Sequence, residues 1–562
     1  MKPRGSLRGR RPHRRVAAAL AAAAVVCTMH GSAQASNVTE FPDNGSEQLA
    51  RGGAWVARAS DPLATYFNPA GLAGQGHALT LQTSLIFHRT CFTRLKAPND
   101  ASVDDLADPT TGEFPRVCRD IEPNLNPQLA GTVRVHDRAT IGLAILAPSS
   151  AGNATWPEFV DSAGGPAASP NRYLRNRLRG LILNPTIGVG VKVIDQLRIG
   201  ASFSWGIAQL RLSNTSTAIN TDGQSPANDV RSNLQVKDLF VPSVGVGAIY
   251  SPLEWLDVAG FYKWSDAIRA RGDVGTAANY YTKQNAAGDD SRVKYGDSIY
   301  EDCGTGNPTD AAAKPCGSGG NGVFTLKIPM EAKLGVRYHR PRPKPQTIGP
   351  QVIEGEVEKP KLTTRDPMAD DAFDVELDLT WANDSAIKAV DVAFPGNENG
   401  DGKIPVAGIP GVIPPSPSSP RSYKDVFGVR LGGDYVVLPD QLAVRAGGFY
   451  ETAAGDSTYQ NVNFAASWRL GLAAGATYRV RFGNGSALDV MGGFAHVFVG
   501  TQENRGPDDV RAIAGTPCNP TASSPGSTCP DGQEKYRTNW AVNLGTITNS
   551  INVFNLGATY RF

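Results

Sequence analysis

The sequence predicts an all-β protein, a fourteen-stranded antiparallel transmembrane β-barrel, on the strength of three observations. The chain opens with an export signal, no later apolar stretch is long enough for a transmembrane helix, and many segments alternate apolar with small or polar residues. An exported chain without such helices is either soluble or inserted as a closed barrel, because only helices and closed barrels satisfy every backbone group in lipid. The alternation within the segments decides between these two possibilities.

The composition excludes some classes of partner. The 562 residues carry 55 Lys and Arg against 53 Asp and Glu, so the chain lacks the strong positive charge of a nucleic-acid-binding protein. We therefore expect no nucleic-acid partner. The 61 Gly and 40 Pro are typical of many short strands and turns rather than of helical cores.

Residues 1–35 have the three parts of a secretory signal peptide. A start rich in Lys and Arg precedes an apolar run from Val16 to Met29, and Ala33-Gln34-Ala35 supplies small residues at the positions that a signal peptidase reads. We predict cleavage after Ala35, so that the mature protein begins at Ser36. A short membrane anchor is the alternative, but the apolar run falls short of the about 20 residues that span a bilayer.

Each strand of an outer-membrane barrel needs about ten residues in which lipid-facing apolar side chains alternate with small or polar lumenal ones. Residues 197–207 show the pattern, with an apolar row that includes Trp205 and an opposite row of Arg, Gly and Ser. Fourteen segments meet this template, and an even number is expected of a bacterial barrel. They are residues 77–90, 127–136, 140–148, 181–193, 197–212, 236–250, 256–270, 323–339, 372–393, 424–437, 441–452, 467–481, 487–500 and 549–562.

The connections between these segments alternate in length, as expected of a barrel with short periplasmic turns and long outer loops. One connection departs from this pattern, because residues 340–371 should form a periplasmic turn but make a long stretch rich in Pro. We interpret it as a Pro-rich periplasmic linker or a small insertion. A soluble β-sandwich or propeller is the alternative fold, but its outward positions should be mostly charged, whereas one face of most segments lacks charge.

Six cysteines remain after removal of the signal, an even count that favours disulfides in an exported protein. Zinc binding is the alternative, but no Cys-x-x-Cys pair occurs. The simplest pairing joins sequence neighbours, and each pair then falls in a predicted outer loop. These pairs are Cys91 with Cys118, Cys303 with Cys316, and Cys518 with Cys529.

A segment between the signal and the first strand resembles a known family. Residues 52–73 are rich in Gly and Ala and end in Tyr66-Phe67-Asn68-Pro69-Ala70-Gly71-Leu72-Ala73. This segment resembles the opening of the FadL-type family, the outer-membrane transporters of long-chain fatty acids and aromatic hydrocarbons. Weaker similarities extend along the chain, among them Leu438 to Gly447 and the terminal Tyr560-Arg561-Phe562.

The resemblance implies a fourteen-stranded barrel in the outer membrane of a Gram-negative-type bacterium, with an N-terminal hatch segment inside the lumen. The chain would then divide into a signal peptide at 1–35, a hatch at 36–76 and a barrel at 77–562 that includes the linker at 340–371. The long linker and the disulfide-stapled loops depart from the family pattern. The hatch motif would serve packing and turn formation, and it consists of Asn68, Pro69, Ala70 and Gly71.

No pattern in the sequence indicates an enzyme. None of the histidines of the mature part stands in a recognisable catalytic motif, and no nucleophile elbow, zinc-protease or phosphate-loop motif occurs. Residues 397–402 resemble the first half of a calcium loop, but the twelfth position is Gly408 rather than Glu. We expect neither a cofactor nor a bound metal.

These observations favour passive uptake of hydrophobic compounds, such as long-chain fatty acids or aromatic hydrocarbons, by a monomeric channel. The expected partners are outer-membrane lipid and a hydrophobic small molecule. A fatty acid needs a cation for its carboxylate, and Arg198, Lys263 and Arg445 face the predicted lumen, although each could instead pair with Glu451 or Asp257. One alternative is a surface or adhesive protein whose disulfide-stapled loops bind a partner, and another is a general porin.

Overall fold

The computed structural model describes residues 44–96, 106–119, 123–147, 154–163, 165–217, 229–278, 321–342, 366–393, 404–405, 412–413, 418–421, 423–455, 457–462, 466–483, 485–505 and 542–562. The predicted signal peptide, most of the Pro-rich linker, the calcium-like loop and four of the six cysteines that follow the signal lie outside these residues. Those cysteines are Cys303, Cys316, Cys518 and Cys529.

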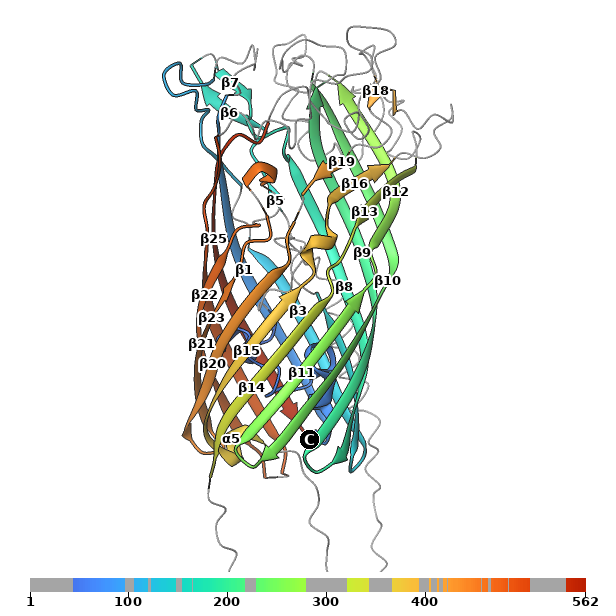
Figure 1. Ribbon diagram of the computed structural model, residues 1–562, viewed down its shortest axis with the longest axis vertical. Helices are drawn as coiled ribbons and strands as arrows, with labels where there is room; N and C mark the ends of the chain where they lie inside the picture. Colours follow the sequence, from blue (N-terminus) through green and yellow to red (C-terminus); the bar gives the residue numbers. More distant parts are fainter. Residues whose placement is uncertain are drawn as a thin grey trace, which may run out of the picture.

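Fourteen antiparallel strands form the wall of a closed barrel (Figure 1). Closure is visible at β1, which pairs with the last strand over its whole length, from Ala78 opposite Arg561 to Arg94 opposite Gly545, and with β3 on its other side. The barrel predicted from the alternation is therefore confirmed. Its strands are β1 (Ala78–Arg94), β3 (Asn124–His136), β4 (Ala139–Leu146), β8 (Arg177–Ile194), β9 (Leu197–Thr217), β10 (Asp229–Leu253), β11 (Leu256–Ser265), β14 (Glu331–Pro341), β15 (Asp371–Ala382), β20 (Val426–Leu438), β21 (Leu442–Glu451), β22 (Arg469–Arg481), β23 (Ala487–Val499) and β25 (Gly545–Arg561).

Three predicted strands are interrupted, which corrects the sequence prediction. The segment 256–270 divides into β11 and β12 (Ile268–Ala278), 323–339 into β13 (Asn321–Leu326) and β14, and 372–393 into β15 and β16 (Ala389–Ala393). At the first break the Asp266 carboxylate accepts the amide of Ala267 at 2.7 Å, which competes with ladder pairing. Pro329, which has no amide hydrogen, lies at the second, and the 3-10 turn η3 (Asp384–Ala386) lies at the third.

The strands beyond these breaks, β12, β13 and β16, continue the wall toward the end of the barrel opposite the short turns. There β12 pairs with β10 and β13, β13 with β16, and β16 with β19 (Ser418–Pro420). Cys91 of β1 forms a disulfide with Cys118 of β2, directly opposite in the pairing of these strands. The other short elements are β2 (Val117–Cys118), β5 (Ala154–Thr155), β6 (Phe159–Ser162), β7 (Gly165–Ala168), β17 (Ile404–Pro405), β18 (Val412–Ile413), β24 (Gln502–Asn504), η4 (Ser457–Tyr459) and the helix α5 (Pro367–Asp370).

The exterior of the wall is an apolar band. Leu143, Leu334 and Leu556 are 59%, 65% and 65% exposed, whereas the lumenal neighbours Lys333 and Asn555 are 5% and 1% exposed. An apolar exterior over a polar interior is the arrangement of a barrel surrounded by lipid, so the chain is an outer-membrane β-barrel. Short turns such as Asp195–Gln196 and Glu254–Trp255 mark the periplasmic end, at the bottom of Figure 1.

No helix of the described residues has the length and apolar character needed to cross a bilayer.

Residues 44–76, called here the N-terminal segment, lie inside the periplasmic half of the barrel (Figure 1, dark blue). The segment contains α2 (Ser46–Ala50), α3 (Ala64–Phe67) and the 3-10 helix η1 (Pro69–Leu72). Helix α2 contacts β21, β22, β23 and β25, while η1 contacts β4, β8, β9 and β10. The segment therefore contacts strands on opposite sides of the barrel lumen.

Candidate functional site in the barrel lumen

The four residues of the predicted hatch motif form a tight turn against the wall. The Asn68 side chain donates to the carbonyl of Val56 at 2.8 Å and accepts the amide of Ala70 at 3.2 Å, which caps η1. Pro69 follows at the first helical position, where no amide donor is needed. A Cβ on Gly200 of β9 would lie 2.2 Å from the carbonyl carbon of Pro69, so the turn docks on bare backbone. All four motif residues are buried.

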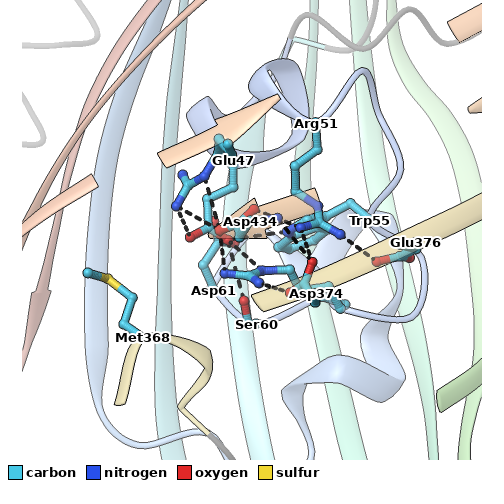
Figure 2. Close-up of polar contacts among 12 residues, drawn as sticks. Glu47, Arg51, Trp55, Ser60, Asp61, Met368, Asp374, Glu376 and Asp434 are labelled. Atoms are coloured by element: carbon cyan, nitrogen blue, oxygen red, sulfur yellow. Dashed lines mark hydrogen bonds and ion pairs between the residues drawn. The ribbon is translucent and has the colours of Figure 1, made fainter. Parts of the chain in front are cut away.

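Two arginines of the N-terminal segment hold it against carboxylates of the wall (Figure 2). Arg51 is fully buried, and its guanidinium donates to Asp374 at 2.6 Å, Asp434 at 2.7 Å and Glu376 at 3.1 Å. Arg58 also bonds Asp374, and it pairs with Asp434 at 2.9 Å. Charge-assisted hydrogen bonds of this kind are the strong ones in a protein, so these ion pairs attach the segment firmly to the wall, beside the apolar contacts of Trp55 and Leu72.

Strand β15 places a row of three acids toward the lumen. Asp374, Glu376 and Asp378 alternate along the strand and are buried. Asp378 accepts the amides of Trp55 and Val56 at 2.9 and 3.2 Å, and Glu376 accepts the amide of Ala57 at 2.6 Å. The carboxylates thus satisfy backbone donors of an irregular segment that has no sheet partner of its own.

The structure places the three predicted lumenal cations in different environments. Arg445 is buried in ion pairs with Asp434 at 3.1 Å and Glu47 at 3.4 Å. The Lys263 ammonium donates to the hydroxyl of Tyr66 and lies 4.0 Å from the centre of its ring. Each of these two cations holds the N-terminal segment, and neither is paired with Glu451 or Asp257, the two carboxylates considered from sequence.

Arg198 has a different environment. Its guanidinium lies 3.8 Å from Asp257 and 3.5 Å from the Ser251 hydroxyl, both at the limit of direct contact. The oxygens of Asp257 are already occupied, one by the Ser251 hydroxyl and the other by Arg337 at 3.0 Å and His339 at 3.3 Å. The Arg198 side chain is 18% exposed.

A cavity of about 410 Å³ lies between the N-terminal segment and the wall at the periplasmic mouth. Ala57, Ala59 and Gly74 line it on one side, and the turns after β8 and β10 line it on the other. Arg198 borders the cavity, and Pro367 of α5 closes part of it. The cavity therefore combines small residues of the N-terminal segment with polar and charged residues of the wall, among them Lys192, Arg198 and Arg337.

The polarity of the wall reverses on the extracellular side of Trp205. Below it on β9, Ser202 and Ser204 face the lumen and apolar residues face outward. Above it, Leu210 and Leu212 face inward and Gln209 is exposed outside.

The same reversal on neighbouring strands builds one apolar cluster inside the extracellular part of the barrel. Its members are buried although their outward neighbours are polar, as Val236 beside Lys237 shows. The cluster includes Leu210, Leu212, Leu234, Val236, Phe324 and Leu326.

Two carboxylates of the N-terminal segment differ in charge state. Burial raises the pKa of Asp61 to about 7, and the charge of Glu47 adds to the rise. One carboxylate oxygen of Asp61 accepts the amide of Leu63 at 2.8 Å, and the other has no hydrogen-bond partner among the described residues. Burial would raise the pKa of Glu47 too, but the guanidinium groups of Arg445 and Arg58 hold it at about 2. Burial therefore favours the neutral form of Asp61, whereas the two guanidinium groups favour the charged form of Glu47.

Known structures match this arrangement over nearly the whole chain. A FadL homologue of Pseudomonas aeruginosa is 17% identical with a TM-score of 0.61, and the match covers 93% of this chain and 99% of that one. The CymD monoaromatic hydrocarbon channel is 14% identical with a TM-score of 0.52, covering 94% and 99%. The Ralstonia pickettii toluene transporter TbuX is 13% identical with a TM-score of 0.52, covering 93% and 99%. The chain has the FadL-type fold.

No family model and no curated protein sequence matches the chain. The FadL-type fold was nevertheless indicated by the motif at residues 66–72, which now proves to be the turn docked on β8, β9 and β10. Arg51, Arg58 and the acids of β15 were not among the residues predicted from the sequence. A usable signal was present, because Asp374-Val375-Glu376-Leu377-Asp378 places acids at every second position of a predicted strand.

Proposed function

We propose that this FadL-type barrel is an outer-membrane channel for the passive uptake of hydrophobic compounds. The observation that carries the proposal is the apolar cluster inside the extracellular part of the wall. A barrel wall is held by its closed hydrogen-bond ladder and needs no apolar interior for this. An apolar interior instead offers a hydrophobic solute about 25 cal/mol per Å² of surface removed from water.

We infer that residues 36–76 act as a hatch below this cluster. The described part of the hatch buries Arg51 and Arg58 among carboxylates, so a hydrophobic solute that descends the lumen meets ion pairs. Such a solute cannot replace charge-assisted bonds. Passage inward or sideways therefore needs the hatch to shift, which breaks contacts to β15 and β20.

The solved neighbours support hydrophobic solutes of two chemical classes, since one is a FadL homologue and others are named as hydrocarbon or toluene channels. A neutral arene needs no cation, whereas a fatty acid does. We assign the fatty-acid carboxylate to Arg198, because it is the predicted cation that borders the periplasmic cavity. Lys263 and Arg445 hold the hatch instead.

The test is uptake of labelled oleate and labelled toluene by cells whose only channel for hydrophobic solutes is this protein. Cells with the protein should take up at least one of the two faster than cells without it. Equal uptake of both in the two strains would contradict the channel. Rapid permeation of small sugars into liposomes that contain the protein would favour the general porin instead.

The variant Arg198→Gln separates the two solute classes. Its control is Lys192→Gln, which removes a cation of the same cavity that already pairs with Asp195 at 3.3 Å. If the substrate is a fatty acid, Arg198→Gln lowers oleate uptake and leaves any toluene uptake unchanged, while the control leaves both unchanged. Unchanged oleate uptake in Arg198→Gln would refute the assignment to Arg198 and leave the channel standing.

A further inference from the structure

Five exposed cations lie on the outside of the barrel, on the strands that enclose the apolar cluster. They are called here the outer cation belt. Each directly follows an inward-facing member of the cluster, as Lys237 follows Val236 and Lys327 follows Leu326. The strand alternation therefore fixes them on the outer face. The belt consists of Arg179 on β8, Lys237 on β10, Arg269 and Arg271 on β12, and Lys327 just after β13.

The belt begins directly beyond an aromatic girdle. The rings of Trp205 and Phe240 are 4.6 Å apart, and both side chains are exposed on the outer face together with Leu239. Aromatic residues of this kind mark the boundary between hydrocarbon and headgroups. Lys237 is two residues beyond Leu239, a distance of about 7 Å along a strand. The belt is therefore at the height of the lipid headgroups of the outer leaflet.

Two pairs of like charges stand directly opposite each other in this region. Lys237 is opposite Arg271 in the pairing of β10 with β12, and Arg179 is opposite Arg211 in the pairing of β8 with β9. Like charges directly opposite across two strands destabilise a sheet. An anion held between Lys237 and Arg271 would remove the repulsion of that pair.

In the described part of the wall, acidic residues neutralise one belt cation, Arg269, and form no ion pair with the other four. Asp266 pairs with Arg269 at 3.0 Å, and Asp238 accepts two backbone amides, those of Phe240 and Arg269. Within the part of the chain that the structure describes, no ion pair joins the other four belt cations to a carboxylate. The positive charge of the belt thus faces the headgroup layer.

We propose that the outer cation belt binds the phosphate groups of a phosphorylated glycolipid of the outer leaflet, with Lys237 and Arg271 at its centre. A phosphate brings charge of the right sign, and its oxygens accept the two parallel bonds that a guanidinium donates. The lipid would seal the barrel against its surroundings on the side where the apolar cluster is built. The proposal does not depend on what the barrel transports.

The experiment uses the full chain in nanodiscs of phosphatidylcholine with and without lipid A, a bis-phosphorylated glycolipid. The double variant Lys237→Gln/Arg271→Gln is compared with Arg138→Gln/Arg340→Gln, which removes two exposed cations at the periplasmic end. Bound lipid A is counted by native mass spectrometry at increasing lipid A fraction. We expect the belt variant to need about tenfold more lipid A for half-occupancy, the factor that corresponds to about 1.4 kcal/mol, and the control to match the wild type.

Binding of a dephosphorylated lipid and the unfolding temperature test the same proposal. Lipid A without its phosphates should bind the wild type as weakly as intact lipid A binds the belt variant. In phosphatidylcholine alone, the belt variant should unfold at the same temperature as the wild type or higher, because a like-charge pair is gone. Equal lipid A occupancy of belt variant and control, or tight binding of the dephosphorylated lipid by the wild type, would overturn the proposal.

Discussion

Replacing Arg51 by Met should release the N-terminal segment from the wall while the barrel stays folded. The substitution keeps a long side chain and removes a guanidinium that bonds three carboxylates within 3.1 Å. Removing one partner of a buried ion pair costs roughly 3–5 kcal/mol, because the other partner stays buried without compensation.

This cost sets the expected size of the effect. At about 1.4 kcal/mol per factor of ten, the docking equilibrium of the segment should shift by roughly a hundredfold to several thousandfold. We expect a shift of about a hundredfold, the lower end of this range, because Arg58 and Arg337 still pair with Asp374 and Arg445 still pairs with Asp434. The β-ladder contacts of the wall do not involve Arg51, so the barrel itself should keep its stability.

The assay is hydrogen exchange of peptides from residues 44–76 together with single-channel conductance in a planar bilayer. The Arg51→Met variant should show faster exchange in this segment alone and more frequent opening events. The control is Arg340→Met, which removes an exposed arginine of β14. Exchange and conductance equal to those of the control would refute the view that charge docks the segment.

Three further predictions concern the same lumen. Burial raises the pKa of Asp61 to about 7, above the about 4 of a solvated Asp, so docking binds a proton, is strongest at acid pH and weakens as the pH rises from about 4 to 7. A spin label on the segment should become more mobile over this range, and Asp61→Asn should reduce the change. A wild-type signal independent of pH, or an unchanged response in Asp61→Asn, would contradict this prediction. Leu210→Asn places a polar group in the apolar cluster and should lower uptake of hydrophobic solutes several-fold. The control Gln209→Asn changes the neighbouring outward-facing residue and should leave uptake unchanged. Equal uptake by the two variants would count against the cluster as the binding surface. Gly200→Val would place a Cβ 2.2 Å from the carbonyl carbon of Pro69. Hydrogen exchange of residues 66–73 should therefore accelerate, while the barrel keeps its heat-modifiable migration in electrophoresis. Unchanged hydrogen exchange would show that the turn does not dock on Gly200.

The period-two pattern was sufficient to predict the wall, because lipid on one side and a polar lumen on the other impose opposite requirements on successive residues. On β25 Phe554 and Leu556 are exposed, as is Phe562 directly after the strand, whereas Asn555 and Thr559 are buried, as the alternation predicts. The breaks in three strands were not predictable in this way. They depend on single local features, such as the side-chain bond of Asp266 to the next amide.

The ion pairs that dock the N-terminal segment could not be predicted from the sequence, for a different reason. Arg51 and Asp374 are 323 residues apart, and only the register of the closed barrel brings them together. Pairing of Arg445 with Glu451 was one alternative considered from the sequence, but Glu451 pairs with Arg430 and Arg469, and Arg445 pairs with Asp434 and Glu47. A pattern along one strand reports which face a charge occupies, whereas the partner across the lumen depends on the whole barrel.

The most direct test of uptake through the barrel is to lock the N-terminal segment to the wall. A Cβ on Gly493 of β23 would lie 3.4 Å from the Cβ of Ala50 in α2, close to the about 3.5–4.5 Å of a disulfide. Uptake of oleate and toluene is measured for Ala50→Cys/Gly493→Cys, oxidised and then reduced, beside the wild type and both single variants in the same reagents. Oxidation should stop uptake by the double variant and reduction should restore it, whereas wild-type uptake by the oxidised double variant would contradict transport through a moving hatch.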